Sequence, residues 1–62
     1  MKISIEKLTE MMSRRLETNE TLAKKTGLSV GTISRIRNGR EPRVSTLRKL
    51  TEALECSIED LI

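Results

Sequence analysis

The sequence predicts an all-α fold, a compact bundle of five short helices that forms one domain over residues 1–62. Apolar residues recur at intervals of three and four in successive segments, which is the spacing of one face of a helix. Serine or threonine precedes several of these segments, where its hydroxyl can accept from the free amides of the first turn. At 62 residues the chain is near the lower size limit for a domain without disulfides or metal, so all the segments are needed to enclose one core.

The stretch from Thr18 to Gly39 predicts two helices joined by a tight turn. Thr18 is a candidate N-cap for the first of them, and Leu22 and Ala23 supply its buried side. Gly27 suits the position after a helix end, where the backbone turns left-handed at least cost to glycine.

The second helix of this stretch is predicted to run from Val30 to about Asn38 after an N-cap at Ser29, and Gly39 closes it. Its inward-facing residues, three positions apart, are Ile33 and Ile36. Two short capped helices joined by Gly-Leu-Ser are typical of a helix-turn-helix. The same pattern also fits a small helical bundle of any function.

The first helix is predicted over Lys2 to Leu16, with Ser4 as a candidate cap. Its apolar stripe comprises Ile5, Leu8, Met12 and Leu16, with Met11 as a further candidate. Glu17 interrupts the apolar pattern directly before Thr18, which predicts an exposed connection.

Two further helices are predicted after a loop over Arg40–Arg43, in which proline keeps the preceding residue out of helical geometry. The fourth helix covers Val44 to Glu55, and its core stripe comprises Leu47, Leu50 and Leu54, with Ala53 close by. A capping box at Ser57–Asp60 then predicts a short fifth helix that continues through Leu61 and Ile62.

The charge is unevenly distributed along the chain. Residues 14–49 contain ten basic and three acidic residues, a net charge of +7, whereas the rest contains two lysines and six acidic residues, a net charge of −4. A basic block of this kind attracts a polyanion and gives salt-dependent binding. An even spread would be expected if the charges served solubility alone.

The outward face of the helix that begins at Val30 carries small or polar residues near its start, as a helix that contacts base edges requires. The candidate base-contacting residues are Val30, Gly31, Thr32 and Arg35. Gly31 weakens the helix by about 1 kcal/mol relative to alanine, which favours a close approach by a ligand, although chance is a fair competitor.

Composition argues against several other functions. With no histidine and one cysteine, Cys56, the chain is expected to hold no metal or other cofactor and no internal disulfide, which fits a cytoplasmic protein. There is no run of membrane-spanning length and no aromatic residue for stacking unpaired bases. No nucleophile–histidine set or glycine-rich phosphate loop is present, so we expect no enzyme.

These features together identify a family resemblance. The run LAKKTGLSVGTISRIRNGREPRVSTLRKLTEALECSIEDLI resembles the Cro/cI-type helix-turn-helix family, also called the Xre family, and the similarity extends over about residues 5–62. The resemblance implies a five-helix domain like that of lambda repressor, in which the helix from Ser29 to Asn38 enters the major groove. It implies a repressor-like transcriptional regulator that binds a specific sequence in double-stranded DNA.

The resemblance also assigns contacts to the DNA backbone. Asn19 stands where relatives commonly have glutamine, and Arg43 stands where related repressors place a phosphate-binding residue. The full set of phosphate-binding candidates is Asn19, Arg37, Asn38, Arg40 and Arg43. The base-contacting positions of the family fall on the four residues named above, and because Gly31 has no side chain, DNA shape is expected to carry part of the specificity.

The chain departs from its relatives at two places. Many carry a partly buried ion pair between the first and third helices; the matching positions are Met12 and Arg37, so the pair is absent and Arg37 is expected to be free for solvent or phosphate. The Gly-Leu that often precedes the second helix is Leu16-Glu17 here.

The expected partner is a pseudo-palindromic operator bound by a homodimer, the free chain being monomeric or weakly associated. The family places the dimer contact near the domain end, where the candidates are Ile58, Leu61 and Ile62, although packing on the core is an alternative role for at least two of them. A second function stays open: the helices serve a protein partner, as in an antitoxin or adaptor. Salt separates the two, because DNA binding weakens steeply as salt rises.

Overall fold

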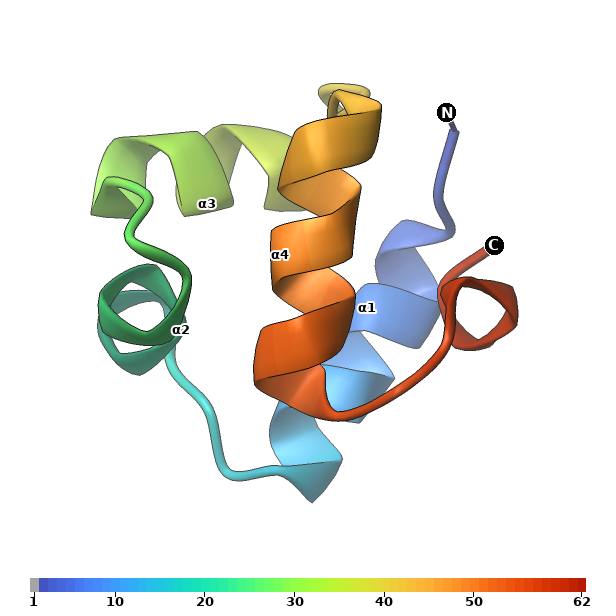
Figure 1. Ribbon diagram of the computed structural model, residues 1–62, viewed down its shortest axis with the longest axis horizontal. Helices are drawn as coiled ribbons and strands as arrows, with labels where there is room; N and C mark the ends of the chain where they lie inside the picture. The colour runs from blue at the N-terminus through green and yellow to red at the C-terminus, as the bar shows by residue number, and fades with distance from the viewer. Residues whose placement is uncertain (1) are drawn as a thin grey trace.

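The computed structural model describes residues 2–62, which form four α-helices followed by one turn of 3-10 helix (Figure 1). The elements in chain order are α1 (Ile5–Arg14), α2 (Asn19–Thr26), α3 (Val30–Arg37), α4 (Val44–Leu54) and η1 (Ile58–Asp60). No strand occurs within residues 2–62, so the predicted all-α class is confirmed.

The prediction of five helices is wrong at its last member. In η1 the amides bond three residues back: Asp60 N–H donates to the Ser57 carbonyl at 3.1 Å, and Leu61 N–H to the Ile58 carbonyl at 2.9 Å. The Asp60 carboxylate accepts from the Ser57 amide at 2.9 Å, so the predicted capping contact forms, but around a 3-10 turn. The segment is too short to offset the unfavourable nucleation of an α-helix.

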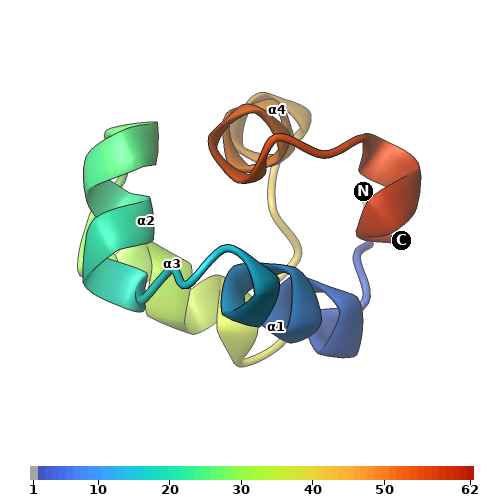
Figure 2. The ribbon, with the colours of Figure 1, turned by 90° about the horizontal axis from the view of Figure 1, so that it is seen from below.

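Helix α4 lies centrally, with α2 and α3 on one side and η1 on the other, and the two ends of the described residues lie close together (Figure 1). Seen from below, α1, α2 and α4 are arranged around one interior, with α3 behind them (Figure 2). Ten apolar side chains fill this interior, none more than 6% exposed: Leu8, Met12, Leu22, Ala23, Ile33, Ile36, Leu47, Leu50, Leu54 and Leu61. The core is therefore entirely aliphatic apart from one thioether.

The predicted caps of the first three helices are confirmed. Ser4 accepts from the Lys7 amide at 3.2 Å, Thr18 from the Thr21 amide at 3.1 Å, and Ser29 from the Thr32 amide at 3.1 Å. Each hydroxyl satisfies an amide that has no partner within its own helix. These local contacts fix where the three helices begin.

Three helices end with the same pair of hydrogen bonds around one left-handed residue, which lies at the cap position or directly after it. Gly39 holds this position after α3 with φ +110°, but Leu16 and Glu55 hold it after α1 and α4 with φ +56° and +52°. At α1 the Leu16 amide donates to the Ser13 carbonyl at 3.1 Å and the Glu17 amide to the Met12 carbonyl at 2.8 Å. Helix α1 is thus shorter than predicted.

Leu16 also points away from the core. Its side chain is 88% exposed, so the prediction that it continues the buried stripe of α1 is wrong. A left-handed backbone brings Cβ of an L-residue close to the following carbonyl oxygen, which costs about 1–2 kcal/mol. Leu16 therefore combines backbone strain with an exposed apolar side chain.

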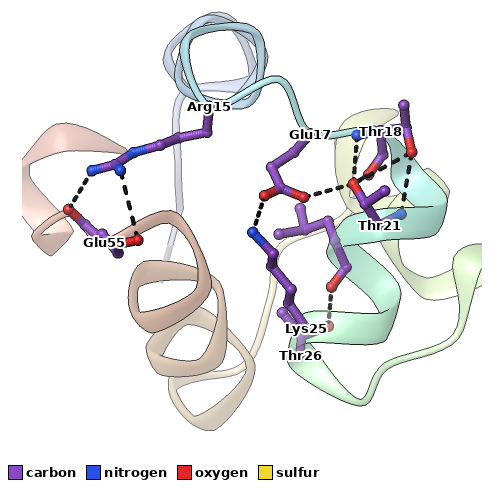
Figure 3. Close-up of polar contacts among 8 residues, drawn as sticks. Arg15, Glu17, Thr18, Thr21, Lys25, Thr26 and Glu55 are labelled. Atoms are coloured by element: carbon purple, nitrogen blue, oxygen red, sulfur yellow. Dashed lines mark hydrogen bonds and ion pairs between the residues drawn. The ribbon is translucent and has the colours of Figure 1, made fainter.

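The predicted exposure of the connection is confirmed at Leu16 and Thr18, but Glu17 between them is folded inward. Its side chain is only 5% exposed and forms an ion pair with Lys25 (Figure 3). The same carboxylate accepts from Thr21 Oγ1 at 2.6 Å. The Lys25 ammonium, and secondarily the Thr21 hydroxyl, lower the pKa of Glu17 below its ordinary value.

A second contact links the ends of α1 and α4, at the opposite end of the molecule from α3 (Figure 1, Figure 3). Arg15 Nη1 lies 3.6 Å from Glu55 Oε2, and Arg15 Nη2 donates to the Glu55 carbonyl at 3.3 Å. Both side chains are exposed, so this pair contributes little to stability.

No helix within residues 2–62 has the length and apolar character needed to cross a bilayer.

We predict that Leu16→Gly stabilises the protein by about 0.5–1 kcal/mol, because relief of the left-handed strain exceeds the added entropy of glycine in the unfolded chain. Denaturant unfolding measures the change. Leu16→Ala is the matched control, since it removes the exposed side chain but keeps Cβ and the strain. Equal stability of the two variants would show that the backbone at this position is unstrained.

We predict that Glu17→Gln lowers the melting temperature at neutral pH and that the difference from the parent protein disappears in acid. Because the pKa of Glu17 is lowered in the folded state, its contribution is present above the ordinary carboxyl pKa and is lost as the pH falls through the folded pKa. Thermal unfolding over a pH series measures this. Glu20→Gln, an exposed position on α2, the helix that carries Lys25, is the control; a Glu17 effect independent of pH would rule out the ion pair as the cause.

Candidate nucleic-acid interface

The connection between α2 and α3 is fixed by a buried threonine. Thr26 is 9% exposed; its hydroxyl donates to the Leu22 carbonyl at 2.8 Å and accepts from the Leu28 amide at 3.2 Å. Gly27 has φ +76°, as predicted for the end of α2, and its amide donates to the Ala23 carbonyl at 2.9 Å. The amides of Gly27 and Leu28 are thus satisfied locally, and α3 starts in a defined direction.

Helix α3 has a buried side and an exposed side. Ile33 and Ile36 are 1% and 2% exposed and anchor it to the core, as predicted. Gly31 and Arg35 are exposed, and Val30 is 44% exposed although it is apolar. Three of the four candidate base-contacting residues therefore lie on an uncovered surface of one helix.

Thr32, the fourth candidate, is partly engaged within the protein. It is half-buried, and its Oγ1 lies 2.9 Å from Ser29 Oγ, the hydroxyl that caps α3. A hydroxyl can donate and accept at once, so this contact leaves Thr32 capacity for a further hydrogen bond.

A hollow lies between α3 and the start of α4. It brings two candidate base-contacting residues, Thr32 and Arg35, next to two arginines of the following loop and helix start, Arg40 and Arg43. Its remaining lining residues are Ile36, Glu41 and Thr46. Three guanidinium groups around one hollow create a positive potential beside the exposed face of α3.

A second, polar hollow lies where α1, α2 and α3 meet. It is lined by Thr9, Asn19, Ser34, Arg37 and Asn38. Within it, Arg37 Nη1 donates to Asn19 Oδ1 at 2.8 Å. The expectation that Arg37 is free is therefore wrong: it holds the start of α2, and three of the five phosphate-binding candidates converge in this one place.

The two hollows flank α3 on opposite sides. At 100° per residue, Thr32, Arg35 and Ile36 point to one flank, while Ser34, Arg37 and Asn38 point to the other. The first hollow contains one carboxylate, on Glu41, and the second contains none. Both are well suited to anionic oxygens, with the uncovered helix face between them.

Sequence reasoning missed the threonine and serine residues of these sites. Thr9 was on the predicted first helix and Thr46 on the fourth, but no local pattern indicates that they lie beside α3. Helical periodicity is the one signal that could have found Ser34, which lies three and four positions before Arg37 and Asn38. The role of Thr26 in the turn likewise has no sequence signal beyond its position before Gly27.

The candidate dimer residues differ in exposure. Leu61 is fully buried in the core, so it offers no surface to a second subunit, and Ile58 is half-buried against the same core. Ile62 is 47% exposed and remains available for contact with a second subunit.

Two titratable groups in the same C-terminal segment have shifted pKa values. Burial raises the pKa of the Cys56 thiol, and the Ser57 amide, by donating to the carboxylate, lowers the pKa of Asp60.

A family model described as the Cro/C1-type HTH DNA-binding domain matches residues 7–62 of this chain. The match covers most of the chain, so the protein belongs to the Cro/C1-type helix-turn-helix family of DNA-binding domains, as the resemblance predicted. No curated protein and no solved structure matches the chain. Membership makes the face between the two hollows the part of the molecule to test for DNA contacts.

We predict that Gly31→Ala stabilises the protein by up to about 1 kcal/mol, the difference in helix propensity. The added Cβ would lie 3.5 Å from Arg35 Nη2 and 3.8 Å from Ser29 Oγ, which are ordinary contact distances. Denaturant unfolding tests this. Ser29→Ala is the comparison: it should lower the free energy of unfolding, since loss of that cap costs about 1 kcal/mol. Destabilisation by Gly31→Ala would show that the added methyl group disturbs the Arg35 or Ser29 side chain despite these distances.

Proposed function

We propose that this chain is a sequence-specific regulator of transcription, of the repressor type, that binds double-stranded DNA through α3 in the major groove. The observation that carries the proposal is the uncovered face of α3 between two hollows rich in hydrogen-bond donors. A major groove about 12 Å wide admits one helix, and the backbone strands on either side then lie against its flanks. This arrangement matches the geometry of a helix-turn-helix on DNA.

Arg35 is the proposed principal base contact. Its side chain is exposed and extends along α3 toward Gly31, where the missing Cβ leaves room around the guanidinium. A guanidinium can donate two parallel hydrogen bonds to O6 and N7 of guanine, which discriminates by about 1–3 kcal/mol. Val30, exposed and apolar, suits a thymine methyl group, and Thr32 suits a base or the sugar-phosphate.

The other arginines are proposed to hold the backbone. Arg40 and Arg43 line the first hollow together with Thr32 and Arg35 of α3, where they would meet the strand that borders the groove. Contacts to phosphate fix the position of a protein on the duplex but carry no sequence information. They also release counterions, so each is expected to steepen the salt dependence of binding.

A homodimer on a pseudo-palindromic site is the proposed bound state. One domain of this size makes few contacts, whereas a two-fold dimer contacts two half-sites about 34–36 Å apart. Ile62 supports this proposal, since it is apolar and 47% exposed at the chain end where relatives associate. Leu61 supports it only indirectly, by anchoring that segment to the core.

We predict that Arg35→Ala changes which sequences are enriched when the protein is selected against random duplex DNA. Loss of a bidentate contact should relax the preference for guanine at one position per half-site and weaken the best site by about 1–3 kcal/mol. An unchanged enriched sequence would exclude Arg35 as the principal base contact.

Arg43→Ala is the matched control, because it also removes one exposed guanidinium. It should weaken all duplexes about equally and reduce the slope of log affinity against log salt concentration by roughly one, while leaving the enriched sequence intact. If the parent protein binds no duplex in a salt-dependent way, the proposed function is wrong, and a protein-interaction role takes its place.

A further inference from the structure

The hydrogen bond between Arg37 and Asn19 joins residues 18 positions apart in the chain. It connects the last residue of α3 to the first residue of α2 at a donor–acceptor distance of 2.8 Å, and both residues are half-buried. It is the only side-chain hydrogen bond between these two helices among the described residues. It therefore fixes the position of one side chain relative to the other.

The chemistry of the pair determines which way the Asn19 amide faces. A guanidinium has five N–H donors and no acceptor, so only the amide oxygen can face Arg37. The two N–H bonds on Asn19 Nδ2 must then point away from Arg37. Without this partner the amide could rotate and present either its oxygen or its nitrogen to an approaching ligand.

The surroundings of this pair suit an anionic oxygen. The hollow adds the hydroxyls of Thr9 and Ser34 and the side-chain amide of Asn38, and it contains no carboxylate. A DNA phosphate that borders the groove occupied by α3 would present such an oxygen to this flank. Asn19 is then required to offer its nitrogen, because its oxygen would face negative charge.

We propose that Arg37 is a positioning residue that acts through Asn19: it holds the amide as a fixed donor, and the Asn19 Nδ2 hydrogens bind one backbone phosphate. This inference rests on the proposed function and deepens it. It changes the role predicted for Arg37 from an independent phosphate contact to a member of a two-residue unit. Two residues that act as one unit have non-additive effects on binding.

The test measures dissociation constants of the full chain for one mixed-sequence duplex of about three helical turns, since a phosphate contact does not depend on sequence. The variants are Arg37→Met, which keeps the aliphatic stem, Asn19→Ala, and the double variant. Arg15→Met is the control for loss of one arginine, because Arg15 pairs with Glu55 away from α3. Thermal unfolding reports on the fold of each variant.

Each single substitution is expected to weaken binding about tenfold, the effect of losing a hydrogen bond to a charged group. Arg37→Met should then change the affinity less than about twofold when Asn19 is already alanine. Multiplicative effects would overturn the proposal, since they would show that Arg37 contacts DNA on its own. Arg15→Met should leave the affinity within about twofold of the parent, and an equal loss in this control would also overturn it.

Asn19→Asp keeps the test decisive even if Arg37→Met unfolds the domain. The carboxylate can still accept from Arg37 and lies in the first turn of α2, so the melting temperature should hold or rise. Binding should nevertheless fall more than about tenfold, because the phosphate would meet an acceptor in place of a donor. Unchanged binding by this variant would overturn the proposal, whereas failure of the parent protein to bind the duplex would overturn the proposed function and this inference with it.

Discussion

The direction of α3 depends on the hydroxyl of Thr26, which is buried in the short connection after α2. This single group donates to the end of α2 and accepts from the turn that follows, so two backbone groups inside the protein are satisfied without water. Gly27 supplies the left-handed step and Ser29 the cap, which leaves the connection little freedom. The exposed face of α3, the two hollows and the approach of Arg37 to Asn19 all require that α3 leave this turn at one angle.

The molecule separates residues that hold the fold from residues that are available to a ligand. On α3 the isoleucine side chains are buried in the core, while the Arg35 side chain makes no ion pair or hydrogen bond among the described residues. On the flank shared with α1 and α2, one hydrogen bond serves both purposes, since it joins two helices and orients a donor. No ion pair joins α1 and α3 among the described residues: Met12 is buried in the core, and Arg37 bonds to α2.

Features that depend on neighbours in sequence were predicted well. The caps at Ser4, Thr18 and Ser29 and the buried stripes of α2, α3 and α4 follow from spacing within one or two turns. Folding also brings together residues that helical periodicity cannot relate. Glu17 pairs with Lys25, and Asn19 bonds to Arg37. Leu16 was placed in the stripe because helical spacing continued, but the chain turned left-handed there. The last helix was overestimated because a capping signal does not state how many turns follow it.

The charge along the chain becomes a charge separation in space. The basic segment contains α2, α3 and most of α4, whereas the acidic remainder contains most of α1 and η1, on the other side of the molecule (Figure 1). A body with separated charges experiences a torque in the field of a polyanion, which acts over roughly a Debye length of 8–10 Å before any contact forms. The domain would therefore rotate during its approach so that α3 leads, and a larger share of collisions would begin in a productive orientation.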